Sequence, residues 1–480
     1  RDPSRIFTTP HFGSPKYRPL NRLAILWTYQ AGDGNPMPFR VRNLAFHLLN
    51  AALVYALGWT LFGSALVAGA AAAWFGLHPL ANQSVIGATW TNTMAHSGFL
   101  LAIVMFTASL RARRWALWLT GALVSGWLAL LTYDSSIVVF PLMALYFGLY
   151  VWLFRRRAAP RRFLVAGSAI AAALMVLYAA ARMLFISDGL SHAASAVPAP
   201  GIIFRNISMY VFALLAPIDT VWANEWLNLP LPSDLHLDTN LVAALAAAAL
   251  LPATGFAAAG TYAVRRHPEL IRGADWAAVA FLLCAVALPL LPVLVFSSHP
   301  SETYLYLPVA FFALLLAYAL GRIIDAAAPR RGRTAYIVVV LSLAAIFAAA
   351  IWTRNDRVVQ CAATAHKIIS GLPAGLSSGG PWTVSLTPAP DASQAPPYGF
   401  YRHRGIGTIG DDDDALTAAL QFAYRNPFLT GELVEPAELA ERCRSILSPR
   451  QICLTVYSDG RLETMDVSLG GKPEKISVPF

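Results

Sequence analysis

The composition of this chain of 480 residues is that of a polytopic membrane protein. Hydrophobic residues make up 57% of it and charged residues only 13%, whereas a soluble globular domain carries roughly 25% charged residues. The formal net charge of +10 does not require a nucleic-acid partner, because arginine in cytoplasmic loops commonly supplies such an excess. Four cysteines without a Cys-x-x-Cys spacing argue against a zinc or redox site.

The apolar segments predict an all-α membrane domain with about ten spans. The chain opens at Arg1 with neither Met nor an apolar run, so we expect the numbering to start inside a longer natural chain. A helix needs about 20 apolar residues to cross a bilayer. The segments that come near this length are 43–62, 64–78, 93–110, 115–133, 135–154, 162–186, 239–264, 275–296, 303–326 and 334–352.

The arginine-rich loops set the orientation. If every span crosses once, four basic loops fall on one side, and the positive-inside rule assigns that side to the cytoplasm. Residues 1–42, 187–238 and 353–480 then lie outside, and the apolar piece 202–216 is predicted to be a half-inserted or interfacial helix rather than a span. The four loops are Arg111–Arg114, Arg155–Arg162, Arg265–Arg272 and Arg330–Arg333.

The composition changes after Trp352, and residues 353–480 predict a small extracytoplasmic α/β module. Residues 371–400 read as loops around one short strand, Trp382–Thr387. Alternating apolar and polar residues around Asp459-Gly460 predict a β-hairpin. Cys443 and Cys453 would both lie in an outer compartment, where disulfides form. The chain is therefore predicted to contain an outer loop with an interfacial helix (1–42), a transmembrane domain (43–352) and this module.

Two acids stand beside apolar segments. Asp134 lies between two apolar runs, and Glu302 precedes a long apolar stretch that reaches Asp325. A carboxylate at the edge of hydrocarbon is costly unless it is paired or faces water, so both are candidate functional residues. Further polar residues at the predicted outer helix ends suggest an outward-facing polar cavity, although helix ends are polar in many proteins. They are His47, Asn50, His78, Gln83, Asn92, His96, Arg182, Arg205, Asp219, Glu225 and His299.

Several short motifs, taken in order, resemble the GT-C superfamily of membrane glycosyltransferases. The similarity is to the bacterial relatives of the O-mannosyltransferases that carry transmembrane and tetratricopeptide-repeat regions, and the repeats are absent here. The motifs are YRPL at 17–20, RNLAFHLLNAALVY at 42–55, HPLANQSV at 78–85, LLTYDSSIVVFPL at 130–142, YAAARMLF at 178–185, RNISMYVFALLAP at 205–217, SETYLYLP at 301–308 and WTRND at 352–356.

The resemblance implies a function and a location. Such enzymes move a sugar from a polyprenyl-phosphate carrier to an acceptor on the non-cytoplasmic face, here of a bacterial inner membrane. The partners would be that lipid, other membrane lipids and, in a larger complex, further membrane subunits. This chain departs from the family by the loss of basic residues. Tyr133-Asp134 stands where the family has Lys-Glu, and Glu302-Thr303 stands where it has Glu-Arg. An alternative is therefore a degenerate GT-C-fold subunit with an accessory role. A transporter is disfavoured, since no span shows the paired broken helices expected there.

The resemblance also assigns roles at the site. Asp134, Glu302 and Asp2 are the candidate catalytic acids, Asp2 being the acid that precedes YRPL in this chain. No dedicated metal site is predicted, and a divalent ion held by Asp134 and Glu302 is an open alternative to their pairing with arginine. Snorkelling to lipid headgroups is the alternative for the arginines. The predicted substrate-binding residues are Arg18, Arg182 and Arg205 for the phosphate, with His299 and Tyr304 beside Glu302.

Overall fold

The computed structural model describes two compact units. Unit 1 comprises Arg1–Asp219 and Pro232–Ile351, and unit 2 comprises Thr220–Leu231 and Trp352–Phe480. The residues described are 5–8, 17–32, 35, 37–87, 91–154, 200–215, 273–294, 302–327, 332–372, 374–377 and 381–388, with parts of 167–180, 420–433 and 451–464.

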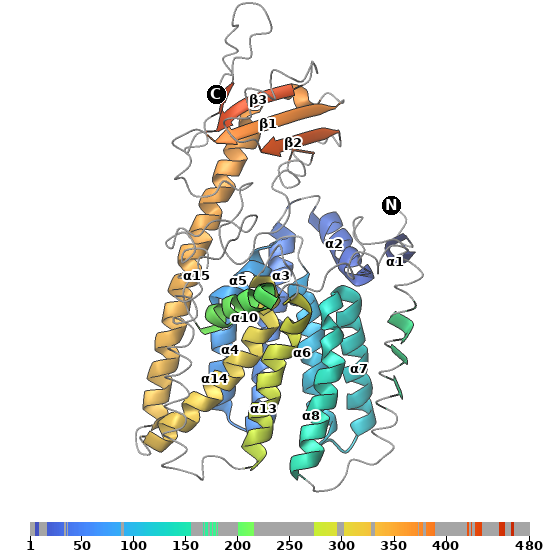
Figure 1. The fold of residues 1–480 in the computed structure, drawn as a ribbon, viewed down its shortest axis with the longest axis vertical. Coiled ribbons are helices and arrows are strands. Elements are labelled where there is room, and N and C mark those ends of the chain that lie inside the picture. Colours follow the sequence, from blue (N-terminus) through green and yellow to red (C-terminus); the bar gives the residue numbers. More distant parts are fainter. Residues whose placement is uncertain are drawn as a thin grey trace, which may run out of the picture. The chain divides into compact units, whose positions relative to one another are not determined.

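Unit 1 is helical throughout its described part (Figure 1). A short helix α1 and the helix α2 precede the apolar helices, and 3-10 turns interrupt the chain at η1, η4 and η5. The elements are α1 (Arg5–Thr8), α2 (Pro19–Gly32), α3 (Met37–Phe62), α4 (Ala65–Gly76), α5 (Pro79–Ile86), α6 (Asn92–Ser109), α7 (Trp115–Thr132), η1 (Asp134–Val138), α8 (Val139–Phe154), α10 (Pro200–Leu215), α13 (Gly273–Ala287), η4 (Leu288–Val293), η5 (Glu302–Leu305), α14 (Tyr306–Ala327) and the start of α15 (Gly332–Gly371).

Four helices among the described residues are long and apolar enough to cross a membrane, so the protein is a membrane protein. They cover Met37–Phe62, Trp115–Thr132, Thr303–Ile324 and Gly332–Thr353. Shorter apolar helices stand at Ala65–Gly76, Asp134–Tyr150 and Ala278–Leu291, where further spans are predicted. The predicted span 239–264 and most of 162–186 lie outside the described residues, so the count of ten stays a prediction.

Small residues allow the first helices to pack closely. Gly63 has a φ of +65° and ends α3 in the left-handed conformation that glycine adopts without strain. The Ser64 hydroxyl then caps α4 by accepting from the Val67 amide. A Cβ added at Gly58 would lie 2.8 Å from Leu314 and 3.1 Å from the Ala68 backbone. Close backbone approach of this kind is how helices associate where lipid removes the hydrophobic drive.

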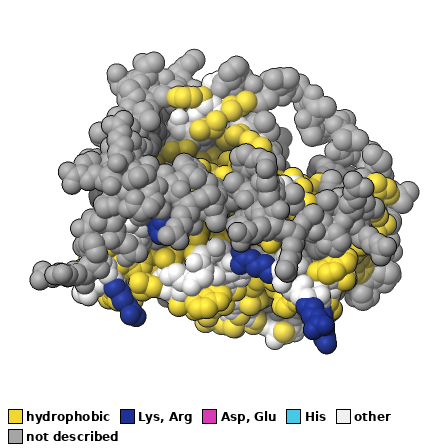
Figure 2. Space-filling view, turned by 90° about the horizontal axis from the view of Figure 1, so that it is seen from below, with side chains coloured by type: hydrophobic (Ala, Val, Ile, Leu, Met, Phe, Trp, Pro, Cys, Tyr) yellow, Lys and Arg dark blue, Asp and Glu magenta, His cyan; other side chains and the backbone are white. Residues whose placement is uncertain are grey.

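The arginines of the α6–α7 turn lie at one end of unit 1, the end where α8 and α14 also finish (Figure 1). Arg111 donates to the Thr60 carbonyl at 2.7 Å, which satisfies a carbonyl near the C-terminus of α3. Figure 2 shows this face of the molecule, with Lys and Arg side chains around an apolar surface. The opposite end of unit 1 carries α2 and the α7–η1 junction (Figure 1).

The helix α10 lies across the other helices of unit 1 (Figure 1). Asn206 is fully buried, and its amide donates to the Leu294 carbonyl at the end of η4 at 2.9 Å. That residues 202–216 form a half-inserted or interfacial helix and not a span stays a prediction.

The helix α2 lies within residues 1–42, where an outer loop with an interfacial helix is predicted, and its outer location stays a prediction. The Arg42 guanidinium on α3 donates to the Thr28 hydroxyl at 3.1 Å and to the Ala24 carbonyl at 3.4 Å. Trp27 and Tyr29 on α2 remain exposed, as expected for an interfacial helix with aromatic anchors. This attachment fixes the segment just before α2, which contains Arg18.

Unit 2 contains a mainly parallel four-stranded sheet with the order β2-β1-β3-β4. Strand β1 pairs in parallel with β2 and β3, and β3 pairs antiparallel with β4, with Val456 opposite Leu462. The predicted strand and hairpin are thus confirmed, whereas the parallel pairing was not predicted. The strands are β1 (Trp382–Pro388), β2 (Leu429–Leu433), β3 (Gln451–Val456) and β4 (Leu462–Thr464), after a 3-10 turn η6 (Ala374–Ser377).

Two further features of unit 2 bear on the predictions. Helix α15 runs unbroken for 40 residues, so the change in composition after Trp352 does not end the helix. Cys453 in β3 is disulfide-bonded, and the predicted partner Cys443 lies outside the described residues.

Candidate functional site

An ion pair between Arg18 and Asp134 lies at the end of unit 1 that carries α2. Helix α7 ends at Thr132, Tyr133 turns to an extended conformation, and Asp134 opens η1. The Arg18 Nε atom donates to Asp134 Oδ2 at 3.1 Å, and the two side chains are 14% and 22% exposed. The Tyr178 hydroxyl donates to Asp134 Oδ1 at 2.8 Å. Both carboxylate oxygens are therefore engaged, and two residues predicted for the site contact each other directly.

The aromatic neighbours of Arg18 fix its orientation. Its guanidinium lies 4.3 Å from the centre of the Tyr133 ring, at cation–π distance. Tyr17 packs against Tyr178, with ring centres 6.3 Å apart, and donates to the Phe7 carbonyl at 3.3 Å. Burial raises the pKa of Tyr17 above its ordinary value, so its hydroxyl stays a donor at neutral pH. Within the described part of the chain, the two terminal amino groups of Arg18 make no further hydrogen bond.

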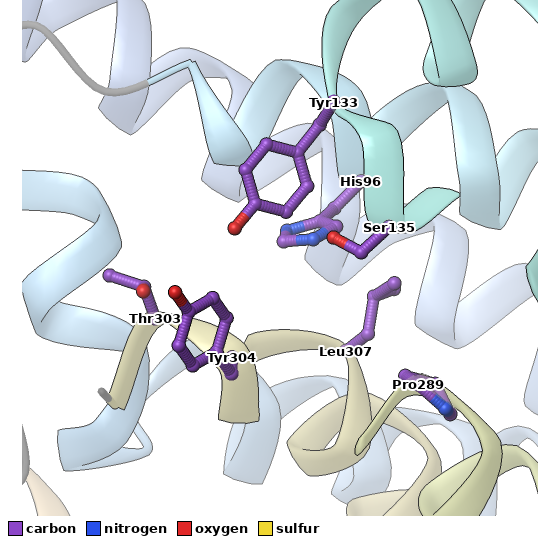
Figure 3. A pocket seen from close by; sticks show the side chains of 7 residues that line it. All are labelled: His96, Tyr133, Ser135, Pro289, Thr303, Tyr304 and Leu307. Atoms are coloured by element: carbon purple, nitrogen blue, oxygen red, sulfur yellow. The ribbon is translucent and has the colours of Figure 1, made fainter. Parts of the chain in front are cut away.

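A small pocket joins the two segments that carry the predicted acids (Figure 3). Tyr133 and Ser135, on either side of Asp134, form one wall, and Thr303 and Tyr304, directly after Glu302, form another. Figure 3 shows the hydroxyls of Tyr133, Thr303 and Tyr304 turned toward the same space. The remaining lining residues are His96, Pro289 and Leu307.

The backbone around Glu302 places Tyr304 and Tyr306 in different surroundings. Tyr304 lines the pocket from η5, whereas Tyr306 begins α14 and is fully buried between helices. Tyr304 and Tyr306 therefore do not share one face. Arg18 and Tyr133 lie near enough to Tyr304 to interact with it electrostatically.

A buried polar cluster behind the pocket holds Tyr306 in place. Its hydroxyl lies 2.7 Å from His47 Nδ1 and accepts from the Asn50 amide at 2.9 Å. His47 Nε2 lies 3.0 Å from the Gly76 carbonyl, which only accepts. His47 therefore carries its proton on Nε2, and Nδ1 accepts from Tyr306. The Asn50 amide also donates to the Thr93 carbonyl at 2.9 Å. This cluster joins α3, α4, α6 and α14.

His96 lies between this cluster and the pocket. Its ring stacks on Tyr306 with centres 4.9 Å apart and an angle of 16°, and meets Tyr133 edge-on at 6.1 Å. The residue is 4% exposed, and its Nδ1 atom has no hydrogen-bond partner in the described structure. Sequence reasoning placed His96 only among polar helix ends and did not single out Tyr133, Ser135 or Tyr178. The one feature that these residues share in the sequence is that each is a polar residue beside an apolar run.

The other predicted site residues are placed less completely. Glu302 opens η5 and Arg205 lies within α10, but the description of both stops at the backbone. Asp2, Arg182 and His299 lie outside the described residues. The structure therefore brings Arg18, Asp134 and Tyr304 to one region, with the backbone of Glu302 beside them.

A metal ion does not fit Asp134 as it is arranged here. Among the described residues there is no group of three or more His, Cys, Asp or Glu side chains that could hold an ion. Each oxygen of Asp134 already accepts a hydrogen bond, and a cation there would be repelled by Arg18, whose Nε atom lies 3.1 Å from Asp134 Oδ2. The charge of the carboxylate is thus balanced by arginine.

Comparison with known proteins gives one structural similarity. No protein-family model matches the chain, and no curated protein matches it. The crystal structure of ArnT from Cupriavidus metallidurans in the apo state is similar over 95% of this chain and 88% of that chain, with 13% identity and a TM-score of 0.39. Agreement at that level supports no residue role, and the proposals below rest on the site itself.

Proposed function

We propose that this protein is a membrane glycosyltransferase of the GT-C type that transfers a sugar from a polyprenyl-phosphate carrier to an acceptor at the outer face. The observation that carries the proposal is the orientation of Arg18. It is held by Asp134 on one side and by the Tyr133 ring on another, while its terminal amino groups remain available. If the tail of the donor lipid lies among the apolar helices of unit 1, its phosphate would lie at the end of these helices, near the Arg18 guanidinium.

The role of Arg18 follows from its chemistry. A guanidinium presents a planar fork of donors that matches phosphate oxygens, and hydrogen bonds between charged groups are about twice as strong as neutral ones. Because Nε is used by Asp134, the terminal amino groups are the donors for the phosphate. We therefore assign Arg18 to phosphate binding and Asp134 to positioning Arg18, in place of the catalytic role that the motif alone suggested for Asp134.

The reaction then needs a base beside the pocket, and the backbone position of Glu302 next to Thr303 and Tyr304 supports Glu302 as that base. The base takes the proton from an acceptor hydroxyl, and that oxygen attacks the anomeric carbon of the sugar. The bond from this carbon to the phosphate oxygen breaks, and the polyprenyl phosphate leaves with the electron pair. Arg18 stabilises the negative charge of the leaving phosphate. Asp2 remains a second candidate base from the resemblance.

One observation supports an outer location for this site. The arginines of the α6–α7 turn lie at the opposite end of unit 1 (Figure 1), and such residues favour the cytoplasmic side.

The test is sugar transfer by the purified protein in nanodiscs, supplied with a panel of polyprenyl-phosphate sugars that carry a radiolabelled sugar. We expect transfer with at least one donor, and loss of at least 100-fold in both Arg18→Ala and Glu302→Gln. Arg40→Ala is the matched control, because Arg40 is an exposed arginine in the first turn of α3. Unchanged transfer in Arg18→Ala would refute the assignment of the phosphate site.

A second candidate is an accessory subunit on the same fold. It is favoured by the closed pairing of Asp134 and by the absence of a charged side chain among the seven residues that line the pocket. In that case the wild-type protein would show no specific binding of any polyprenyl phosphate and would co-purify in fixed proportion with other membrane subunits.

A further inference from the structure

We propose that Arg42 and Asn43, near the start of α3, are positioning residues for the phosphate-binding Arg18. This inference rests on the proposed function and deepens it, because it names residues that hold the phosphate-binding group in place without touching the lipid. The two side chains join α2, which follows Arg18, to α5, which lies against η5. They thereby set Arg18 relative to the segment that carries Glu302.

The backbone of Arg18 is tied to α2. This helix begins at Pro19, directly after Arg18, and the Arg18 carbonyl accepts from the Arg22 amide at 3.2 Å. A bond between residues four apart is the hydrogen bond of an α-helix, so the Arg18 backbone follows any movement of α2. The contacts that hold α2 therefore also determine where the guanidinium of Arg18 can lie.

Arg42 holds the middle of α2. Its Nη1 atom donates to the Thr28 hydroxyl at 3.1 Å and to the Ala24 carbonyl at 3.4 Å. The Thr28 hydroxyl donates in turn to the Ala24 carbonyl at 2.6 Å, so the three groups form a closed set of hydrogen bonds. Hydrogen bonds from a charged donor are about twice as strong as neutral ones. One side chain of α3 thus binds two consecutive turns of α2.

Asn43 carries the connection on to α5. The Nε and Nη2 atoms of Arg42 donate to Asn43 Oδ1 at 3.2 and 3.0 Å. The Asn43 amide nitrogen donates to the Gly87 carbonyl at 2.7 Å and to the Val85 carbonyl at 3.4 Å. These carbonyls lie at the end of α5, where a helix leaves carbonyls without partners of its own. Asn43 is fully buried, and the positive guanidinium on its oxygen strengthens the donation of its amide to α5.

Helix α5 lies against η5, the turn that Glu302 opens. The connected hydrogen bonds therefore run from α2, through Arg42 and Asn43, to the helix that supports η5. Groups that act together on one substrate must be held within about 0.5 Å of their productive positions by the residues around them. The Arg18 guanidinium and the base proposed at Glu302 are carried by elements that this one pair of side chains joins.

The experiment measures binding to the protein in nanodiscs of farnesyl phosphate, a short polyprenyl phosphate, and of farnesol, which lacks the phosphate. Wild type should bind farnesyl phosphate more tightly than farnesol. Arg42→Ala and Asn43→Ala should each lower the affinity for farnesyl phosphate about 10-fold, and Thr28→Val about 5-fold, because a hydrogen bond that involves the guanidinium is lost. The affinity for farnesol should stay unchanged. Thr28→Val nearly keeps the shape of threonine, so it tests the proposal even if the other two variants fail to fold.

Three further variants show whether the effect passes through Arg18. Thr28→Ser keeps the hydroxyl and should bind farnesyl phosphate as wild type does. Thr60→Val is the matched control, because the Thr60 hydroxyl makes the same kind of bond, to the Ala56 carbonyl at 2.7 Å, near the other end of α3. When Arg18→Ala is already present, Thr28→Val should cause no further loss of affinity, since the group that it positions has been removed.

The outcomes separate the two proposals. The positioning role is overturned if Thr28→Val binds farnesyl phosphate as wild type does, or if Thr28→Ser or Thr60→Val loses as much affinity as Thr28→Val. It is also overturned if the full loss from Thr28→Val persists in the presence of Arg18→Ala. In each of these cases the phosphate site at Arg18 stands. Equal binding of farnesyl phosphate and farnesol by wild type would contradict the proposed function, and the positioning role would fail with it.

Discussion

The Arg18–Asp134 pair and the Tyr306 cluster use polar side chains in opposite ways. In the Tyr306 cluster, the two nitrogens of His47 and the hydroxyl of Tyr306 are all consumed by contacts between helices. In the ion pair, Asp134 is fully engaged, but the terminal amino groups of Arg18 make no hydrogen bond in the described structure. Polar groups that pair with one another inside the protein stabilise a fold, whereas oriented groups with spare donors are suited to bind a ligand.

The contrast extends to charge. The Tyr306 cluster is neutral and fully buried, which suits a position among apolar helices, where an unpaired charge is expensive. The ion pair is 14% and 22% exposed and lies where α7 ends. His96 connects the two regions, because it stacks on Tyr306 and also lines the pocket beside Tyr133.

The largest effect is expected at the charged region. Arg18→Ala should lower the affinity for farnesyl phosphate by about 100-fold or more, since hydrogen bonds between charged groups contribute about 1.5–3 kcal/mol each. Binding of the radiolabelled lipid to protein in nanodiscs measures this. The thermal stability of the protein should change little by comparison. A loss of equal size in Arg40→Ala would show that general surface charge, and not this guanidinium, attracts the lipid.

Tyr306→Phe is expected to act on stability instead. The change leaves His47 Nδ1 without its donor in a buried position, which costs about 1–3 kcal/mol. The midpoint of thermal unfolding in detergent should fall, while the folded protein binds farnesyl phosphate normally. Tyr55→Phe, at an exposed position on α3, is the control and should leave the midpoint unchanged. If Tyr306→Phe abolished lipid binding in folded protein, the division between the two regions would be wrong.

Asp134→Asn distinguishes positioning from catalysis. An asparagine carbonyl still accepts from Arg18 but without charge, so Arg18 is held less firmly, and we expect about a 10-fold loss of lipid affinity. Affinity and transfer rate should be measured together. A large loss of transfer with unchanged affinity would restore Asp134 as the catalytic acid. Tighter binding would mean that Asp134 competes with the phosphate for Arg18.

The smallest effect belongs to Tyr178→Phe. The change removes one hydrogen bond to Asp134 Oδ1, which contributes about 0.5–1.5 kcal/mol to holding that side chain. Because Tyr178 contacts Asp134 and not Arg18, only part of this free energy affects the orientation of Arg18. Lipid affinity should fall about 3-fold, measured in parallel with Asp134→Asn. A loss as large as that of Arg18→Ala would show that Tyr178 contacts the ligand itself.

The sequence predicted what depends on local pattern. Length and hydropathy identified the apolar helices, and the position of Asp134 between two apolar runs marked it as a candidate. Alternation around Asp459-Gly460 predicted the β3–β4 pairing. These features are visible because neighbours in the chain determine them.

Long-range contacts could not be predicted in the same way. The pairing of Arg18 with Asp134 joins positions 116 residues apart, and His47 meets Tyr306 across 259 residues. No local signal fixes such partners. The continuation of α15 beyond Trp352 was missed for a different reason, since a polar helix continues an apolar one without a break in backbone hydrogen bonding. The parallel order of unit 2 depends on crossovers that periodicity does not reveal.

A double-mutant cycle of Arg18→Ala and Asp134→Asn on farnesyl phosphate binding tests the central claim most directly. If Asp134 acts only by orienting Arg18, the double variant should bind no more weakly than Arg18→Ala alone, and the two changes should be strongly non-additive. Independent losses that multiply in the double variant would contradict the account, because Asp134 would then contribute to the site without Arg18.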